Sequence, residues 1–319
     1  MLIPIRYRYF SCMSQQNSET AKPNHQRTNP SDQRTTMIKS RSLIPMTLLY
    51  ILAFQIDPSN AEEVSLEFPP SKHVEEIETW DRVVCIKSRD ASNPQTGRLC
   101  SAFMIRKHNR LFLITAGHAS SETNGESQLH YLDPQNQPQW VTLKSIVEPS
   151  KNPWNRDSVS DLAVAELIQR KGNEPYISHL NQLAFDEELL ASTASKRRTE
   201  ITTIGFPLGI GSSGTLSPLA VPGHIVSKEL PAKNDWGTEP IIFSSPPLAQ
   251  GTSGGPAIIT ADDATCEAVV GMYIGVMNDQ SGAKLSKLVP SRLIKQLINE
   301  ANQSDPSHDE AAEAKTEKN

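Results

Sequence analysis

The segment Gly-Thr-Ser-Gly-Gly-Pro at 251–256 places one serine, Ser253, in a glycine-rich turn between apolar runs. A serine hydroxyl is a weak nucleophile at neutral pH. Its attack on a carbonyl therefore needs a base that takes its proton and donors that stabilise the oxyanion. Glycines permit a tight turn in which the amides of Gly251 and Ser253 converge on one point. Gly and Pro also mark ordinary turns, so this segment alone does not establish chemistry.

Two further segments carry groups suited to acid–base chemistry. The apolar run 111–116 leads through Gly117 to His118, and Asp161 directly precedes the alternating run 162–167. Histidine commonly acts as a general base, and a neighbouring carboxylate can fix its tautomer. Three such contexts in one chain favour nucleophilic catalysis over three unrelated coincidences.

The order His118, Asp161, Ser253 along the chain discriminates between folds. α/β-Hydrolases have the order Ser, Asp, His and subtilisins Asp, His, Ser, whereas the chymotrypsin-type fold has the order found here. Residues 78–300 resemble the trypsin-like serine peptidase family. The segments 204–209 (Ile-Gly-Phe-Pro-Leu-Gly) and 223–227 (Gly-His-Ile-Val-Ser) resemble its HtrA-type branch.

This resemblance implies a serine-type endopeptidase, a hydrolase that works through an acyl-enzyme. Ser253 would be the nucleophile, His118 the general base, and the amides of Gly251 and Ser253 the oxyanion hole. Asp157 and Asp161 compete for the third catalytic role. We choose Asp161, because it precedes Leu-Ala-Val-Ala and so matches the family's Asp-Leu-Ala-Val pattern. The alternative function is a catalytically silent barrel of this family that binds exposed peptides without cutting them.

The family also indicates where a substrate would bind. The pocket for the residue before the cut bond should include Tyr273, Ile274 and Gly275 together with the segment 246–249. Neither stretch contains an acid, so we expect a small or medium apolar substrate residue in a protein or peptide. We expect no cofactor and no metal, because Cys-x-x-Cys and His-Glu-x-x-His spacings do not occur.

Short runs rich in Val, Ile, Leu and Phe, bounded by Gly, Pro, Asn and Ser, predict many short strands. With the resemblance, they predict an all-β fold of two packed six-stranded antiparallel β-barrels. The expected strands are 83–87, 102–106, 111–115, 141–147 and 162–167 in the first barrel, and 200–205, 224–228, 241–244, 256–260, 268–272 and 284–289 in the second. A four-residue spacing of Leu and Ile over 293–298 predicts a short C-terminal helix.

The expected domain order places the peptidase domain in the middle of the chain. It comprises a leader with a signal peptide (1–61), a linker (62–77), the peptidase domain (78–301, with barrels at about 78–170 and 171–290) and a tail (302–319). The tail has no large apolar residue that could anchor it, so we expect it to be disordered. HtrA-type relatives usually carry a PDZ domain there, and these residues are too few to form one.

The signal peptide is predicted from a basic segment at 37–41 followed by an apolar run at 43–54. Met37 is the expected start, and cleavage is expected after Ala61. We therefore expect a secreted or periplasmic protein. The apolar run is shorter than the ~20 residues that span a bilayer, so no permanent membrane anchor is expected.

Charge and cysteine content limit the partners further. The net charge is −5, and no basic cluster recurs with a strand or helix period, so nucleic acid is not an expected partner. An oligomer is compatible with the sequence. Cys85, Cys100 and Cys266 follow the expected cleavage site. Cys85 and Cys100 lie on neighbouring expected strands, so a disulfide between them across a hairpin stays open.

Overall fold

Two β-sheets form the framework of the chain in the computed structural model, which describes residues 6–9, 77–89, 96–149, 152–234, 237–263 and 265–303. The expected leader and signal peptide, apart from one short strand, lie outside these residues. So do nearly all of the expected linker and most of the expected tail. Within the described ranges, no helix combines the length and the apolar character needed to cross a membrane.

The first sheet follows the strand order β6-β5-β2-β3-β4-β8-β7. Its strands are β2 (Val83–Arg89), β3 (Thr96–Lys107), β4 (Arg110–Ala116), β5 (Gln128–Leu132), β6 (Pro138–Thr142), β7 (Asn155–Arg156) and β8 (Leu162–Leu167). Two short strands, β1 (Arg6–Tyr9) and β9 (Phe185–Asp186), pair with β3 in parallel. A bridge between Val147 and Leu167 joins the segment after β6 to β8, so the six main strands close into a barrel.

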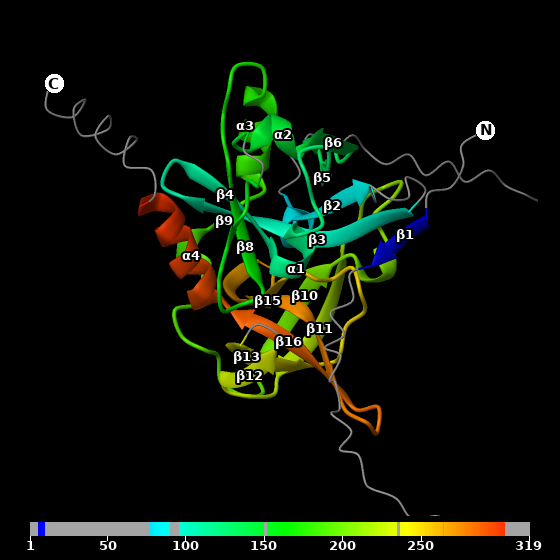
Figure 1. Cartoon of the computed structure of the whole chain (residues 1–319), viewed down its shortest axis with the longest axis vertical. Coiled ribbons are helices and arrows are strands. Elements are labelled where there is room, and N and C mark those ends of the chain that lie inside the picture. Colours follow the sequence, from blue (N-terminus) through cyan, green and yellow to red (C-terminus); the bar gives the residue numbers. More distant parts are fainter. Residues whose placement is uncertain are drawn as a thin grey trace, which may run out of the picture. The chain divides into compact units, whose positions relative to one another are not determined.

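The second sheet follows the order β11-β10-β14-β15-β16-β13-β12, and β11 also pairs with β13. Its strands are β10 (Glu200–Gly205), β11 (Leu219–Ile225), β12 (Leu230–Asn234), β13 (Gly237–Ser245), β14 (Pro256–Thr260), β15 (Cys266–Asn278) and β16 (Lys284–Pro290). The β11–β13 pairing closes six strands into a second barrel, with β12 added as a hairpin on β13. The predicted fold of two six-stranded antiparallel barrels is confirmed (Figure 1).

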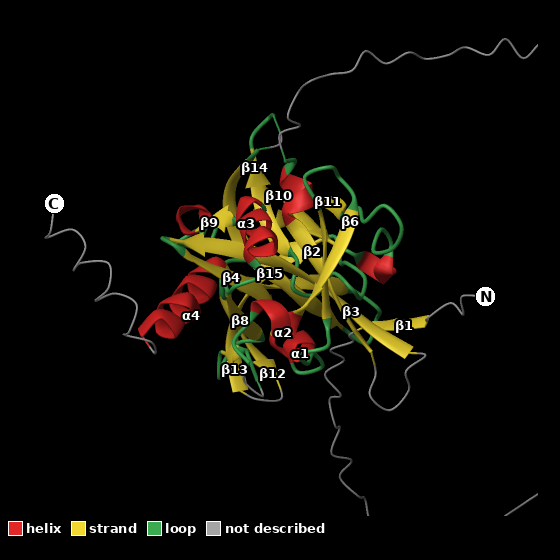
Figure 2. Ribbon diagram, turned by 90° about the horizontal axis from the view of Figure 1, so that it is seen from above, coloured by secondary structure: helices red, strands yellow, loops and turns green. Residues whose placement is uncertain are grey.

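Helices are few and short among the described residues (Figure 2). They are α1 (Gly117–Ser120), α2 (Leu143–Ile146), α3 (Glu174–Gln182) and α4 (Ser291–Gln303), with 3-10 turns η2 (Thr79–Arg82), η3 (Glu187–Leu189) and η4 (Pro207–Gly209). The predicted C-terminal helix is α4, which buries Leu293, Ile294, Leu297 and Ile298. Lys107 of β3 forms a hydrogen bond with Asn299 of α4, so this helix reaches the first barrel after the chain has completed the second.

Two expected strands had wrong bounds. The expected strand 141–147 ends at Thr142, because the next four residues form α2 and bury Leu143 and Ile146. The expected strand 224–228 ends at Ile225 and begins earlier, at Leu219. The helix α3 was not among the expected elements; it begins at Glu174, with a proline in its first turn, where no intrahelical donor is needed.

The open question of a disulfide is settled by strand register. Cys85 lies opposite Ser101, and Ile86 lies opposite Cys100. Adjacent residues of a strand point to opposite faces, so the side chains of Cys85 and Cys100 are on different faces of the sheet. Both are buried free thiols. Burial raises the pKa of each, that of Cys100 to about 12.

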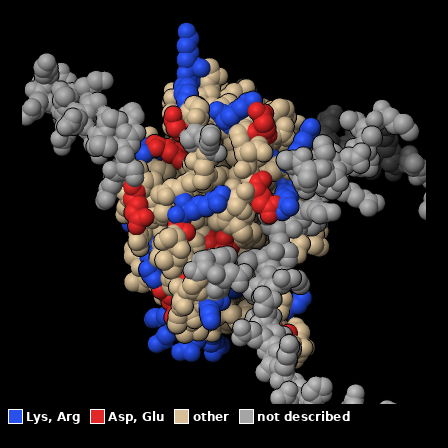
Figure 3. Space-filling view, viewed as in Figure 1, with Lys and Arg blue, Asp and Glu red and all other residues tan. Residues whose placement is uncertain are grey.

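Ion pairs link neighbouring strands on the surface of the described chain. Arg110 of β4 pairs with Glu166 of β8, and Arg106 of β3 lies 2.6 Å from Asp186 of β9. Both signs of charge occur over the face shown in Figure 3. Exposed pairs of this kind contribute about 0–1 kcal/mol each, so the barrels owe their stability mainly to their buried apolar residues.

Candidate active site

His118 and Asp161 lie together because the strands that carry them are neighbours. β4 and β8 run antiparallel with Ala116 opposite Leu162, so the end of one meets the start of the other. Asp161 Oδ2 lies 2.6 Å from His118 Nδ1, and Oδ1 accepts a hydrogen bond of 2.7 Å from the His118 amide. The carboxylate therefore holds both the ring and the backbone of the histidine.

Of the two carboxylates considered from the sequence, the structure brings Asp161 to the histidine. Asp161 is only 4% exposed. Asp157 instead accepts a hydrogen bond of 3.0 Å from the Val159 amide. No hydrogen bond between Asp157 and His118 occurs in the described ranges. Asp157 does line a cavity of about 390 Å³ next to His118 and Asp161.

Ser253 lies in the nucleophile turn, residues 249–255, which connects β13 to β14. Ser253 is 3% exposed. Gly251 and Gly254 have φ values of 95° and 90°, a conformation that side-chain-bearing residues rarely adopt. A Cβ at either position would also collide with a nearby backbone carbonyl. Both positions therefore require glycine, and this requirement explains why the turn is rich in it.

Every carbonyl from 249 to 253 accepts a hydrogen bond. The donors are Thr252 N to Ala249 (3.4 Å), Leu208 N to Gln250 (2.6 Å), Ser101 Oγ to Gly251 (2.8 Å), Gly255 N to Thr252 (2.8 Å) and Ser101 N to Ser253 (2.9 Å). By contrast, the amides of Gly251 and Ser253 donate to no group in the described part of the chain. The turn thus fixes its carbonyls and leaves two amides available to a ligand.

The nucleophile turn contacts the first barrel close to the histidine. Ser101 of β3 donates its amide to Ser253 O. Gly254 packs so tightly against β4 that a Cβ there would collide with Thr115 Oγ1, three residues before His118. The turn that carries Ser253 therefore meets the first barrel beside the strand that leads to His118. Within the described ranges, His118 and Asp161 are joined by hydrogen bonds, whereas no hydrogen bond joins Ser253 to His118.

Glu239 of β13 is a site residue that the sequence reasoning missed. Glu239 is only 1% exposed, and its Oε2 accepts a hydrogen bond of 3.0 Å from the Asp161 amide. It thereby joins the second barrel to the backbone of Asp161 in the first. The expected strand began at 241, so Glu239 fell outside it. A glutamate in such a position ordinarily indicates solvent exposure, and only its cross-barrel contact shows otherwise.

The three predicted substrate-binding residues face different surroundings. Tyr273 Oη donates to Leu248 O at 2.8 Å, which links the two expected walls of the pocket. The backbone of Tyr273 is already bonded to Gly254 and Gly255 of the nucleophile turn. Ile274 is fully buried in the core. At Gly275, φ is 142° and a Cβ would meet nothing within 4 Å, so this position borders open space.

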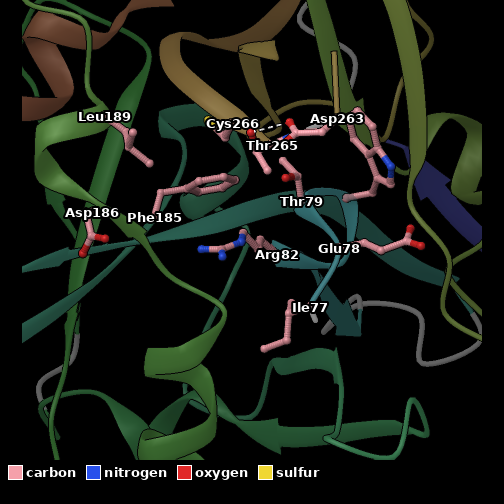
Figure 4. A pocket seen from close by; sticks show the side chains of 11 residues that line it. Ile77, Glu78, Thr79, Arg82, Phe185, Asp186, Leu189, Asp263, Thr265 and Cys266 are labelled. Atoms are coloured by element: carbon pink, nitrogen blue, oxygen red, sulfur yellow. Dashed lines mark hydrogen bonds between the residues drawn. The ribbon is translucent and has the colours of Figure 1, made fainter. Parts of the chain in front are cut away.

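A second cavity, of about 440 Å³, lies away from the predicted triad. None of the three predicted catalytic residues lines it. Figure 4 shows Arg82 beside Phe185, with the guanidinium 5.6 Å from the ring centroid, and Asp263 bonded to Thr265. Cys266 is at its edge, and burial raises the pKa of this thiol to about 11. Among the described residues, no group of three or more His, Cys, Asp or Glu side chains is placed to hold a metal ion.

Comparison with known proteins identifies the family to which this chain belongs. The sequence profile of the trypsin-like peptidase domain matches residues 100–272, more than half of the chain. The chain therefore belongs to the trypsin-like peptidase family, and its class is serine-type endopeptidase. The search of curated proteins returned no match.

Several solved structures are similar at low identity. The active form of the Rv3671c protease from M. tuberculosis is 19% identical, covers 69% of this chain and 81% of its own, and has a TM-score of 0.46. The protease domain of MamO from Magnetospirillum magneticum is 13% identical, with coverages of 69% and 97% and a TM-score of 0.46. The HtrA-type protease AlgW, solved with a tripeptide, is 18% identical, with coverages of 69% and 60% and a TM-score of 0.42. The family assignment rests on the profile.

Proposed function

We propose that this chain hydrolyses peptide bonds with Ser253 as nucleophile, His118 as base and then acid, and Asp161 as the residue that orients the base. The amides of Gly251 and Ser253 stabilise the oxyanion. Ser253 Oγ bonds to the substrate carbonyl carbon while His118 takes its proton, and the C–N bond then breaks as His118 gives that proton to the leaving amine. Water, deprotonated by His118, attacks the resulting acyl-enzyme and releases the acid product and the serine hydroxyl.

The observation that carries this proposal is the pair of hydrogen bonds between Asp161 and His118. A proton on Nδ1 facing Asp161 leaves Nε2 as the basic nitrogen, the tautomer that can accept a proton from a serine. The carboxylate is buried, so water screens its attraction for an imidazolium only weakly. Both properties are what a general base beside a serine requires.

The arrangement of the nucleophile turn supports the oxyanion assignment. The two amides have no acceptor within the described part of the chain, and the carbonyls from 249 to 253 are all bonded. Such amides form a site for a developing negative charge. Because the turn is already held, little reorganisation is needed at the moment of reaction. Gly251 and Ser253 are the residues that contribute these amides.

Substrate is proposed to bind along β15 beyond the nucleophile turn, next to Tyr273, Ile274 and Gly275. Pairing of β15 with β14 ends at Met272, whereas pairing with β16 continues to Asn278. One edge of the intervening residues thus carries no strand within the described chain, and an extended peptide could add there. A small or medium apolar residue before the cut bond is proposed, since the segment 246–249 carries no acid.

The proposed location follows from the sequence alone. We propose export to a secreted or periplasmic location, with a signal peptide removed after Ala61. Amino-terminal sequencing of the exported protein should then begin at Glu62. A mature protein that retains the Ala61–Glu62 bond would contradict this proposal.

A fluorophosphonate probe tests the proposed chemistry directly. The purified chain should form an adduct at Ser253, located by mass spectrometry, because phosphonylation requires an activated serine and a formed oxyanion hole. The Ser253→Ala variant is the control and should form none. Absence of an adduct on the wild-type chain would contradict the proposal and favour the catalytically silent, peptide-binding alternative.

A further inference from the structure

Ser101 of β3 is completely buried and connects the first barrel to the nucleophile turn. Its amide donates to Ser253 O at 2.9 Å, and its hydroxyl donates to Gly251 O at 2.8 Å. The same hydroxyl accepts a hydrogen bond of 3.0 Å from the Phe206 amide. Thr115 Oγ1 in turn donates to Ser101 O at 2.9 Å. Ser101 thus makes three hydrogen bonds across the contact between the barrels, and a fourth holds it within the first barrel.

Its two acceptors on the turn belong to the two residues proposed to form the oxyanion hole. Gly251 and Ser253 each have their carbonyl bonded to Ser101, while their amides have no acceptor in the described ranges. The Gly251 carbonyl shares a peptide plane with the Thr252 amide, and the Ser253 carbonyl shares one with the Gly254 amide. These two planes flank the plane that carries the Ser253 amide, and the first of them adjoins the plane that carries the Gly251 amide. Fixing both carbonyls from Ser101 therefore restricts the rotations that would turn the Gly251 and Ser253 amides away.

Such a restraint is needed because Gly251 has no side chain to limit its rotation. Glycine populates positive and negative φ about equally, so a peptide flip at Gly251 meets little intrinsic resistance. Its observed φ of 95° is one of several accessible conformations. The hydroxyl of Ser101 donates a hydrogen bond to the Gly251 carbonyl, and a rotation that turned this carbonyl away would break the bond.

We propose that Ser101 is a positioning residue for the oxyanion hole: its hydroxyl fixes the carbonyl of Gly251, and its amide that of Ser253, so that both amides face the reacting carbonyl. This inference rests on the proposed function and adds a residue to it. It also makes the hole dependent on the first barrel, which contributes none of the amides.

The test compares the full-length chain with its Ser101→Ala variant in phosphonylation of Ser253 by a fluorophosphonate. The variant keeps the amide bond to Ser253 but loses the hydroxyl. The limiting rate constant of phosphonylation should fall about tenfold to hundredfold, less than the 10²–10³-fold loss typical of removing an oxyanion donor itself. The probe concentration at half-maximal rate should change little, because the binding surface is unaltered. Rates are expressed per folded molecule, with the folded fraction taken from thermal unfolding.

Two further variants separate positioning from general damage. Ser88→Ala removes a similarly buried hydroxyl from the neighbouring strand β2, where it bonds Ser127 at 2.7 Å, and should leave the rate constant unchanged. Ser101→Cys keeps a weak donor of similar size and should give an intermediate rate, which also covers the case in which the alanine variant does not fold.

The outcomes distinguish this inference from the function on which it rests. A labelled wild type with equally fast Ser101→Ala or Ser101→Cys variants would overturn the inference alone. A loss of rate as large in Ser88→Ala as in Ser101→Ala would also overturn it. A wild-type chain without an adduct at Ser253 would overturn the proposed function and this inference together.

Discussion

The acid–base pair and the nucleophile turn are held in different ways. His118 and Asp161 are joined by two hydrogen bonds within the first barrel, where β4 ends and β8 begins. Ser253 lies in a glycine-rich turn of the second barrel that depends on Ser101 of the first. Strand pairing within the first barrel thus positions the proposed base. The surroundings of the proposed nucleophile, in contrast, depend on contact between the two barrels.

The largest effect is expected on the nucleophile side of this comparison. Ser253→Ala should lower kcat for hydrolysis of a fluorescein-labelled casein by roughly 10⁶-fold, because no other group can form the acyl-enzyme. Thermal unfolding should be nearly unchanged, since the substitution removes one hydroxyl. Residual hydrolysis within tenfold of wild type would show that another residue is the nucleophile.

The acid–base side is tested by replacing the two candidate carboxylates. Asp161→Asn should lower kcat by about 10⁴-fold, because an amide favours the wrong histidine tautomer. Asp157→Asn is the matched control on the same loop, and its kcat should stay within a few fold of wild type. A larger loss in Asp157→Asn than in Asp161→Asn, measured with the same casein substrate, would reverse the assignment.

Substitution of Glu239 tests the hydrogen bond that joins the second barrel to Asp161 of the first. Glu239→Ala leaves the buried Asp161 amide without its acceptor, which should lower the free energy of unfolding by about 1–3 kcal/mol. Glu239→Gln keeps an acceptor oxygen and should lose less. Chemical denaturation measures both.

A control for this prediction lies on the same hairpin. Glu229 pairs with Arg292 of α4, and both side chains are partly exposed. Glu229→Gln should therefore change the free energy of unfolding by only about 0–1 kcal/mol. If the Glu239→Ala variant lost no more free energy of unfolding than the Glu229→Gln variant, the contact of Glu239 with Asp161 would contribute nothing to stability.

The smallest effect concerns thiol reactivity in the two barrels. Burial raises the pKa of Cys266 to about 11 and that of Cys100 to about 12. Only the thiolate reacts, so at pH 8 iodoacetamide should modify both slowly in the folded chain, with Cys266 ahead of Cys100. Raising the pH toward 11 should accelerate labelling of Cys266 first. After unfolding without a reductant, Cys85 and Cys100 should both be modified, and protection of that pair would indicate a disulfide.

The sequence predicted the fold, and it suggested the three proposed catalytic residues, because both inferences depend on local patterns. Alternating apolar runs defined most strands, and the glycines at 251 and 254 match φ values that the turn requires. The sequence did not predict Ser101 or Glu239. Each acts on a residue more than 75 positions away, through a register that only the folded barrels establish. Their types, a serine and a glutamate, carry no signal of burial.

The proposed catalytic residues lie on two separate stretches of the chain, which matters for protein engineering. The mostly exposed segment 191–199 joins the piece that carries His118 and Asp161 to the piece that carries Ser253. A chain opened there would leave the base and the nucleophile on separate fragments, with α4 of the second fragment still able to dock on β3 of the first through Asn299 and Lys107. Reassembly of the two fragments would bring the three proposed catalytic residues back into one molecule, so this scaffold is suited to a split reporter in which turnover reports proximity.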